Sequence, residues 1–224
     1  MRSKNVMLFG FIFMFFSAKT ALAQPMEGVI SYTIGYEVVE EGRIDLELYK
    51  TMLPQKLEFL LKDKNSLLKF EGGMTEGLLG DMLYQSKRKM WYSIFHHNKT
   101  VIQLSESNLK STAQKTVFQA VKTQEISILL GHHCTRYVVK DTSNGSETSL
   151  WCTTSIPNAS SGVLTHFLEN MTLFDVAGLE GFPLKIEFKS KEFDLTLLAE
   201  KMEQKKLSEN LFEIPKGYKL SESN

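Results

Sequence analysis

Apolar and polar residues alternate along most of the chain between residues 27 and 218. From Glu27 to Val39, for example, Ile30, Tyr32 and Ile34 lie on one side of the alternation and polar residues on the other. Because successive side chains of a strand point to opposite faces, this period of two predicts half-buried β-strands. Similar strand-like runs lie at residues 44–50, 57–62, 67–71, 82–85, 90–96, 101–104, 117–121, 125–130, 184–189, 193–197 and 211–218.

The period changes once, after Pro157. Leu164, Phe167, Leu168 and Met171 follow the i, i+3, i+4, i+7 spacing of a helix, and Ser160 or Ser161 is available as its N-cap. We therefore predict a mainly β (α+β) fold. It consists of a curved antiparallel sheet or half-barrel of about ten strands with one covering helix. The concave side of such a sheet is where we expect any ligand to bind.

Both cysteines lie in a segment, Leu130 to Pro157, that reads as a hairpin around Asn144-Gly145. A two-residue turn there places Cys152 opposite Tyr137. A three-residue turn with a bulge at Gly145 instead places Cys134 opposite Cys152. Because an exported protein with two cysteines usually pairs them, we predict the bulged register and a Cys134–Cys152 disulfide.

Residues 1–23 have the pattern of a secretory signal peptide. A basic start precedes an apolar run, Val6 to Phe16, that is too short to span a membrane. Ala21-Leu22-Ala23 provides a cleavage site, so we expect cleavage after Ala23. The predicted product, residues 24–224, is a single β-rich domain in the periplasm or outside the cell, with no membrane span.

The charge balance argues against some partners. The chain has 26 basic and 26 acidic residues. Residues 1–23 hold three of the basic residues and none of the acidic ones, which leaves 23 against 26, a net charge of −3. We therefore expect no nucleic-acid partner. The basic run from Lys87 to Lys89 reads as a solvated turn.

No residue pattern predicts catalysis. The sequence contains no G-x-S-x-G elbow, and the glycine-rich stretch from Glu71 to Gly80 lacks the lysine and hydroxyl of a phosphate-binding loop. The paired histidines, His96-His97 and His132-His133, could supply a metal site only if one member of each met a carboxylate. A metal-dependent hydrolase is thus a minor alternative, and we assign no catalytic residue, metal or cofactor.

Several short motifs occur in a characteristic order. They are Gly131-x-x-Cys134-x-x-Tyr137, then Trp151, then Gly181-x-Pro183-Leu184, and finally Phe212-x-Ile214-Pro215-x-Gly217-Tyr218. In these motifs the chain resembles an exported bacterial family catalogued as domain of unknown function 4412 and common in Bacteroidetes. The resemblance implies an envelope or secreted location. It also implies a distant likeness to the half-barrel of LolA-like lipoprotein carriers, which hold acyl chains.

Together these observations favour a non-enzymatic exported protein. We expect its concave face to bind an apolar or amphipathic ligand, such as a lipid. The alternative is an envelope module that serves structure or protein interaction and has no ligand.

Overall fold

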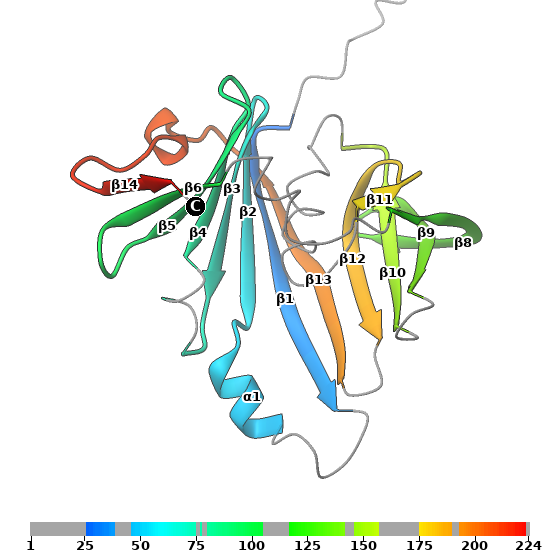
Figure 1. Cartoon of the computed structure of the whole chain (residues 1–224). Helices are drawn as coiled ribbons and strands as arrows, with labels where there is room; N and C mark the ends of the chain where they lie inside the picture. The colour runs from blue at the N-terminus through cyan, green and yellow to red at the C-terminus, as the bar shows by residue number, and fades with distance from the viewer. Residues whose placement is uncertain are drawn as a thin grey trace, which may run out of the picture.

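The computed structural model of the chain describes residues 26–38, 46–74, 77, 80–104, 117–141, 146–156, 175–189 and 193–222. Most of them form strands (Figure 1). The elements are β1 (Gly28–Val38), α1 (Leu46–Met52), β2 (Lys56–Lys62), β3 (Asn65–Glu71), β4 (Asp81–Gln85), β5 (Met90–Phe95), β6 (Thr100–Leu104), β7 (Val117–Gln119), β8 (Val121–Leu129), β9 (His132–Asp141), β10 (Ser146–Thr153), β11 (Asp175–Ala177), β12 (Phe182–Lys189), β13 (Phe193–Gln204), the 3₁₀ helix η1 (Glu209–Phe212) and β14 (Lys219–Glu222).

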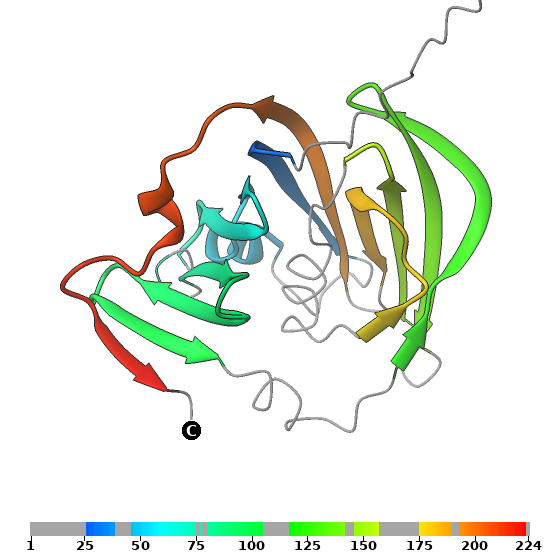
Figure 2. The same ribbon diagram turned by 90° about the horizontal axis from the view of Figure 1, so that it is seen from above.

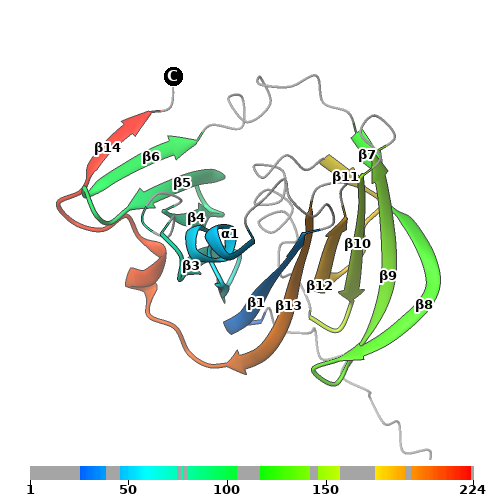
Figure 3. The ribbon, with the colours of Figure 1, turned by 90° about the horizontal axis from the view of Figure 1, so that it is seen from below.

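Twelve strands form one open sheet in the order β14-β6-β5-β4-β3-β2-β1-β13-β12-β10-β9-β8. Neighbouring strands are antiparallel, apart from the parallel pair β14 and β6. The sheet curls without closing, with β14 at one edge and β8 at the other (Figures 2 and 3). β7 and β11 form a separate two-stranded parallel sheet.

Register shifts accompany the curvature. They occur in β1 between Ser31 and Tyr32, in β10 between Trp151 and Cys152, and in β8 after Lys122. A β-bulge bends the strand that carries it and increases its local twist. The resulting sheet has a concave and a convex face, which differ in what covers them.

The predicted fold class is confirmed in part. The chain is mainly β and its antiparallel sheet is curved, but the sheet has twelve strands rather than about ten. The strand predicted at residues 44–50 is wrong, because α1 begins at Leu46. The alternation there rested partly on Leu48, whose side chain is exposed rather than part of a buried face. The helix predicted from Ser160 to Met171 lies outside the described residues.

Two apolar clusters fill the two faces of the sheet. On the concave face, the concave cluster has these buried members: Met26, Ile30, Tyr32, Leu57, Phe59, Leu61, Leu68, Phe70, Met82, Trp91, Ala120, Cys134, Tyr137, Val139, Leu150, Cys152, Ile156, Phe182, Leu184, Ile186, Leu195, Leu197 and Ala199. On the convex face, the convex cluster has these: Val29, Leu60, Leu67, Leu83, Tyr92, Ile94, Val101, Leu207 and Phe212. Neighbours such as Val29 and Ile30 divide between the clusters, as strand alternation requires.

The C-terminal segment covers the convex face. Leu207 and Phe212 belong to the convex cluster, and Leu211, Ile214 and Tyr218 pack against it. Figure 2 shows this segment, with η1, running outside β2 to β6. Among the described residues, this segment is therefore the cover identified on the convex face.

The glycine-rich stretch contains a close backbone approach. Gly73 has φ +76°, and a Cβ atom there would lie 2.2 Å from the carbonyl oxygen of Leu53. Gly131 has a similar φ of +79° but nothing within 4 Å of its Cβ position. Both glycines therefore adopt a left-handed backbone that would be strained in an alanine, while only at Gly73 would the added Cβ also clash with another part of the chain.

We predict that Gly73→Ala lowers the free energy of unfolding by about 2–4 kcal/mol, through backbone strain plus displacement of the Leu53 carbonyl. Gly131→Ala, the matched control, should lose only about 1 kcal/mol. Urea unfolding of both variants measures the difference. Equal losses would contradict the steric role of Gly73.

Candidate functional site

The concave cluster forms rows of side chains across neighbouring strands. One row joins Tyr36, Leu195 and Phe188 through paired positions of β1, β13 and β12, and it continues through Thr148 to Val139. Within this row Leu195 and Val139 are buried, whereas Tyr36 and Phe188 are only partly buried. This end of the concave face is therefore more accessible than its centre.

Exposed apolar side chains lie close to that end. Tyr36 donates a hydrogen bond of 2.8 Å from its hydroxyl to the carbonyl oxygen of Pro54, just after α1. The Met74 amide donates to the Thr51 carbonyl at 3.0 Å, which places Met74 beside the same helix. Met74 is 73% exposed, and Leu48 and Met52 are also exposed. We call Leu48, Met52 and Met74 the α1 rim.

Thr148 adds a polar group to the apolar row. It is buried, and its hydroxyl oxygen has no hydrogen-bond partner among the residues that the structure describes. An unpaired buried hydroxyl costs about 1–3 kcal/mol. The concave face thus combines an extended apolar surface with an unsatisfied hydrogen-bonding group.

We predict that Thr148→Val raises the free energy of unfolding by about 1 kcal/mol, because it removes an unpaired hydroxyl without changing the side-chain shape. Thr153→Val is the control and should lower stability. The Thr153 hydroxyl lies 2.8 Å from the Ser155 hydroxyl and accepts the Ser155 amide. Thermal unfolding compares the two variants, and destabilisation by Thr148→Val would show that its hydroxyl is paired in solution.

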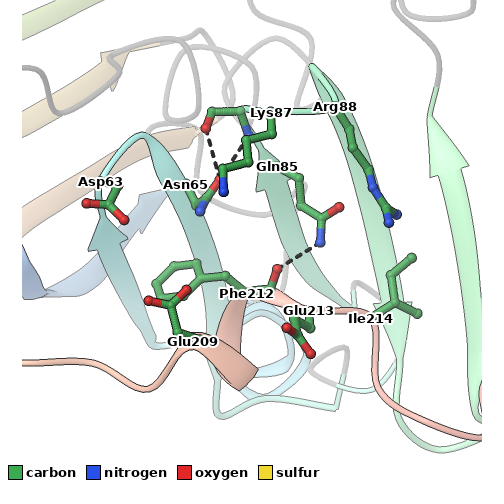
Figure 4. A pocket seen from close by; sticks show the side chains of 10 residues that line it. Asp63, Asn65, Gln85, Lys87, Arg88, Glu209, Phe212, Glu213 and Ile214 are labelled. Atoms are coloured by element: carbon green, nitrogen blue, oxygen red, sulfur yellow. Dashed lines mark hydrogen bonds between the residues drawn. The ribbon is translucent and has the colours of Figure 1, made fainter.

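A second candidate site is an open pocket of about 540 Å³ on the other side of the sheet. Its walls are the β2–β3 turn, the β4–β5 turn and the segment containing η1. Figure 4 shows Asp63 and Glu209 at one side and Arg88 at the other, with Phe212 and Gln85 between them. The pocket is mainly polar and carries charges of both signs.

Hydrogen bonds join the two turns and the segment. The Asn65 side-chain oxygen accepts from the Ser86 amide at 2.9 Å and lies 3.1 Å from its hydroxyl. The Gln85 side-chain nitrogen donates to the Phe212 carbonyl oxygen at 2.8 Å. These bonds hold the three walls of the pocket in a fixed arrangement.

Lys62, the last residue of β2, anchors the C-terminal segment just before η1. Its ammonium group donates to the Leu207 carbonyl at 2.6 Å and lies 3.3 Å from Glu27 and 3.1 Å from Glu209. The Leu207 amide donates to Glu27 at 2.7 Å. This hydrogen bond, together with the charge of Lys62, lowers the pKa of Glu27 from its ordinary value.

The histidines form two separate groups. His96 lies 2.8 Å from the Tyr218 hydroxyl and 2.9 Å from an Asp81 carboxylate oxygen. His132 lies 2.6 Å from the Ser155 hydroxyl. The meeting of one histidine from each pair, which the metal-site alternative requires, does not occur, because His96 follows β5 and His132 begins β9, far apart in the sheet order. Within the described ranges, no group of three or more His, Cys, Asp or Glu residues could hold a metal ion.

The predicted cysteine register is wrong by one residue. Cys152 pairs with Thr135 rather than with Cys134, and both cysteines are buried free thiols, so the predicted disulfide is not formed. The turn itself, residues 142–145, lies outside the described residues. Burial raises the pKa of Cys134 and raises that of Cys152 well above its ordinary value.

We predict that neither thiol reacts with iodoacetamide in the folded protein, because the thiolate is the reactive form and burial disfavours it. Both should react once urea unfolds the chain. Mass spectrometry under non-reducing conditions counts the added groups. Labelling of the folded protein, or a mass that shows a disulfide, would contradict two buried free thiols.

The sequence did not identify the pocket. The sequence predicts a solvated turn at Lys87 and Arg88, and these side chains are exposed, but their turn also forms a wall of the pocket. The opposite wall comes from residues more than a hundred positions later, so no local pattern could reveal it. The apolar motif from Phe212 to Tyr218 was the available signal that this segment packs on the sheet.

The fold defines a protein built on one open, curved β-sheet, and its sequence identifies the family. The chain belongs to the family described as Domain of unknown function (DUF4412), whose model matches residues 41–218. This confirms the family resemblance, while the likeness to LolA-type carriers stays a prediction.

Other comparisons add little. No curated protein matches the chain. The solved structures that it resembles include PNGF-II in the C2 space group, with 15% identity and a TM-score of 0.46 over 87% of this chain and 31% of that one. PNGF-II in the P21 space group matches with 14% identity and a TM-score of 0.46, over 87% and 32% of the two chains. The chain thus spans about a third of that protein. None of the described helices is long and apolar enough to cross a membrane.

Proposed function

We propose that this protein is an exported, non-enzymatic binding protein that takes an apolar or amphipathic ligand, such as a lipid, on the concave face of its sheet. The observation that carries the proposal is the continuous concave cluster, which becomes accessible near Tyr36 and Phe188. The N-terminal pattern of residues 1–23 supports export to the periplasm or beyond.

The centre of the concave cluster is already buried, so the ligand reaches the face from its α1 end. Tyr36 and Phe188 are partly buried there, and Met74 of the α1 rim is exposed. An acyl chain placed against these side chains would remove apolar surface from water, worth about 25 cal/mol per Å². The unpaired hydroxyl of Thr148 lies in the same row and suits a polar group of an amphipathic ligand.

The second candidate function is an envelope module for structure or protein interaction, without a ligand. Exposed apolar residues on the edge strand β8 favour it: Val121, Ile126 and Ile128 are each more than 60% exposed. Edge strands with exposed apolar side chains readily pair with another chain. The two functions differ in whether the concave face carries a bound molecule.

Tryptophan fluorescence can test the concave face directly. The two native tryptophans lie away from the accessible end: Trp91 pairs with Tyr84 near the β4–β5 turn, and Trp151 lies beside Arg136 and Lys185, with ring contacts of 5.4 and 4.6 Å. A reporter variant that combines Phe188→Trp with Trp91→Phe and Trp151→Phe therefore carries its one indole at the accessible end of the concave face. We predict that palmitate changes its emission saturably, and that protein purified from its native envelope yields an apolar molecule on extraction and mass spectrometry.

A charge on the α1 rim should interfere with binding. In the background of this reporter variant, Met74→Asp should weaken palmitate binding about tenfold, because the carboxylate lies beside the path of the acyl chain. Leu220→Asp is the matched control: Leu220 is 50% exposed on the distant strand β14, and its substitution should leave binding unchanged. Absence of both an extracted molecule and a fluorescence response of the reporter variant would favour the ligand-free alternative.

A further inference from the structure

Several charged side chains of the pocket on the convex side have no ionic partner. Lys87 and Arg88 line it from the β4–β5 turn, Asp63 from the β2–β3 turn and Glu213 from the C-terminal segment. Among the described residues, none of these four groups takes part in an ion pair or a side-chain hydrogen bond. The pocket therefore presents uncompensated charges of both signs.

Two basic residues elsewhere on the sheet are paired. Lys62 contacts both Glu27 and Glu209, and Arg136 binds both carboxylate oxygens of Glu125, at 2.8 and 2.9 Å. In the pocket, by contrast, opposite charges share one space without meeting. The volume of about 540 Å³ lies within the range of small-molecule sites.

The framework of the pocket is fixed before any ligand arrives. The hydrogen bond from the Ser86 amide to Asn65 joins the β4–β5 turn to the β2–β3 turn. The hydrogen bond from the Gln85 side chain to the Phe212 carbonyl joins the C-terminal segment to β4. Phe212 is itself buried in the convex cluster. A second polar atom, the Gln85 side-chain oxygen, is buried without a hydrogen-bond partner in the described part of the chain. Preorganised walls reduce the entropy that binding costs.

We propose that this pocket binds a zwitterionic ligand, one that carries an ammonium group together with a phosphate or carboxylate. Arg88 and Lys87 bind the anionic group, since a guanidinium offers paired donors and an ammonium a compact charge. Asp63, which lies across the pocket from Arg88, binds the cationic group. The ligand completes the ion pairs that the protein leaves open. This site is independent of the concave face and of the function proposed for it.

Calorimetric titration of the full mature chain with phosphoethanolamine tests the proposal. We expect saturable binding at low ionic strength that weakens with added salt. Ethanolamine and inorganic phosphate, which each carry half of the charge pattern, should bind at least about tenfold more weakly, because each loses one charge-assisted contact.

Conservative variants separate recognition from folding. Asp63→Asn keeps a residue that tolerates the left-handed backbone at φ 56°, and Arg88→Gln changes an exposed side chain. Each should weaken phosphoethanolamine binding about tenfold, whereas Lys64→Gln and Lys89→Gln, in the same two turns, serve as controls and should leave it unchanged. Unaltered thermal unfolding of all four variants shows that the fold is intact.

Two further arms distinguish the sources of such a ligand. Vesicles of phosphatidylethanolamine and phosphatidylcholine present the headgroup on a membrane, and glycylglycine presents a free zwitterion with a carboxylate. Sedimentation with the vesicles that depends on Asp63 and Arg88 identifies a lipid headgroup, while binding of glycylglycine identifies a free peptide-like ligand. No binding of any zwitterion, or equal binding of phosphate with no effect of Asp63→Asn, overturns the proposal. None of these outcomes depends on palmitate binding or on Met74.

Discussion

The structure depends on one constraint: strands β1 to β5 carry apolar side chains on both faces. Val29 and Ile30 are adjacent in β1 and both are buried, one on each face. A sheet with this pattern cannot leave either face in water, because each buried Val, Leu, Ile or Phe side chain contributes about 1.5–3 kcal/mol. The convex face of this half therefore requires a cover, and the C-terminal segment provides it through Leu207 and Phe212.

The opposite half of the sheet follows a different rule. In β9, β10 and β12 the outward positions hold Arg136, Trp151 and Lys185, with the two cations placed over the indole ring. Charged and amphipathic side chains can face water while their stems cover the sheet. No covering segment is needed there, which explains why the sheet can remain open and still bury its concave cluster.

The periodic features of the fold are predictable from the sequence, and the long-range features are not. The alternation from Glu27 to Val39 predicted β1 almost to the residue, because a half-buried strand repeats every two residues. The same rule failed at Leu46 and Leu48, since three apolar residues at alternate positions, from Ile44 to Leu48, are too few to exclude a helical turn. The cysteine register failed for a related reason: a hairpin register depends on its turn, and a shift of one residue places Cys152 opposite Thr135.

The two candidate sites differ in the same way, since one follows from a periodic pattern and the other from long-range contacts. A concave apolar face could be predicted, because it follows from strand alternation and curvature. The charged pocket could not, because it is a consequence of covering the convex face. Once Phe212 enters the convex cluster, Glu213 must lie next to the β2–β3 and β4–β5 turns, whose tips carry Asp63 and Arg88. The hydrophobic requirement of the sheet thus positions the polar groups, and the covering segment brings the charges of the pocket together without neutralising them.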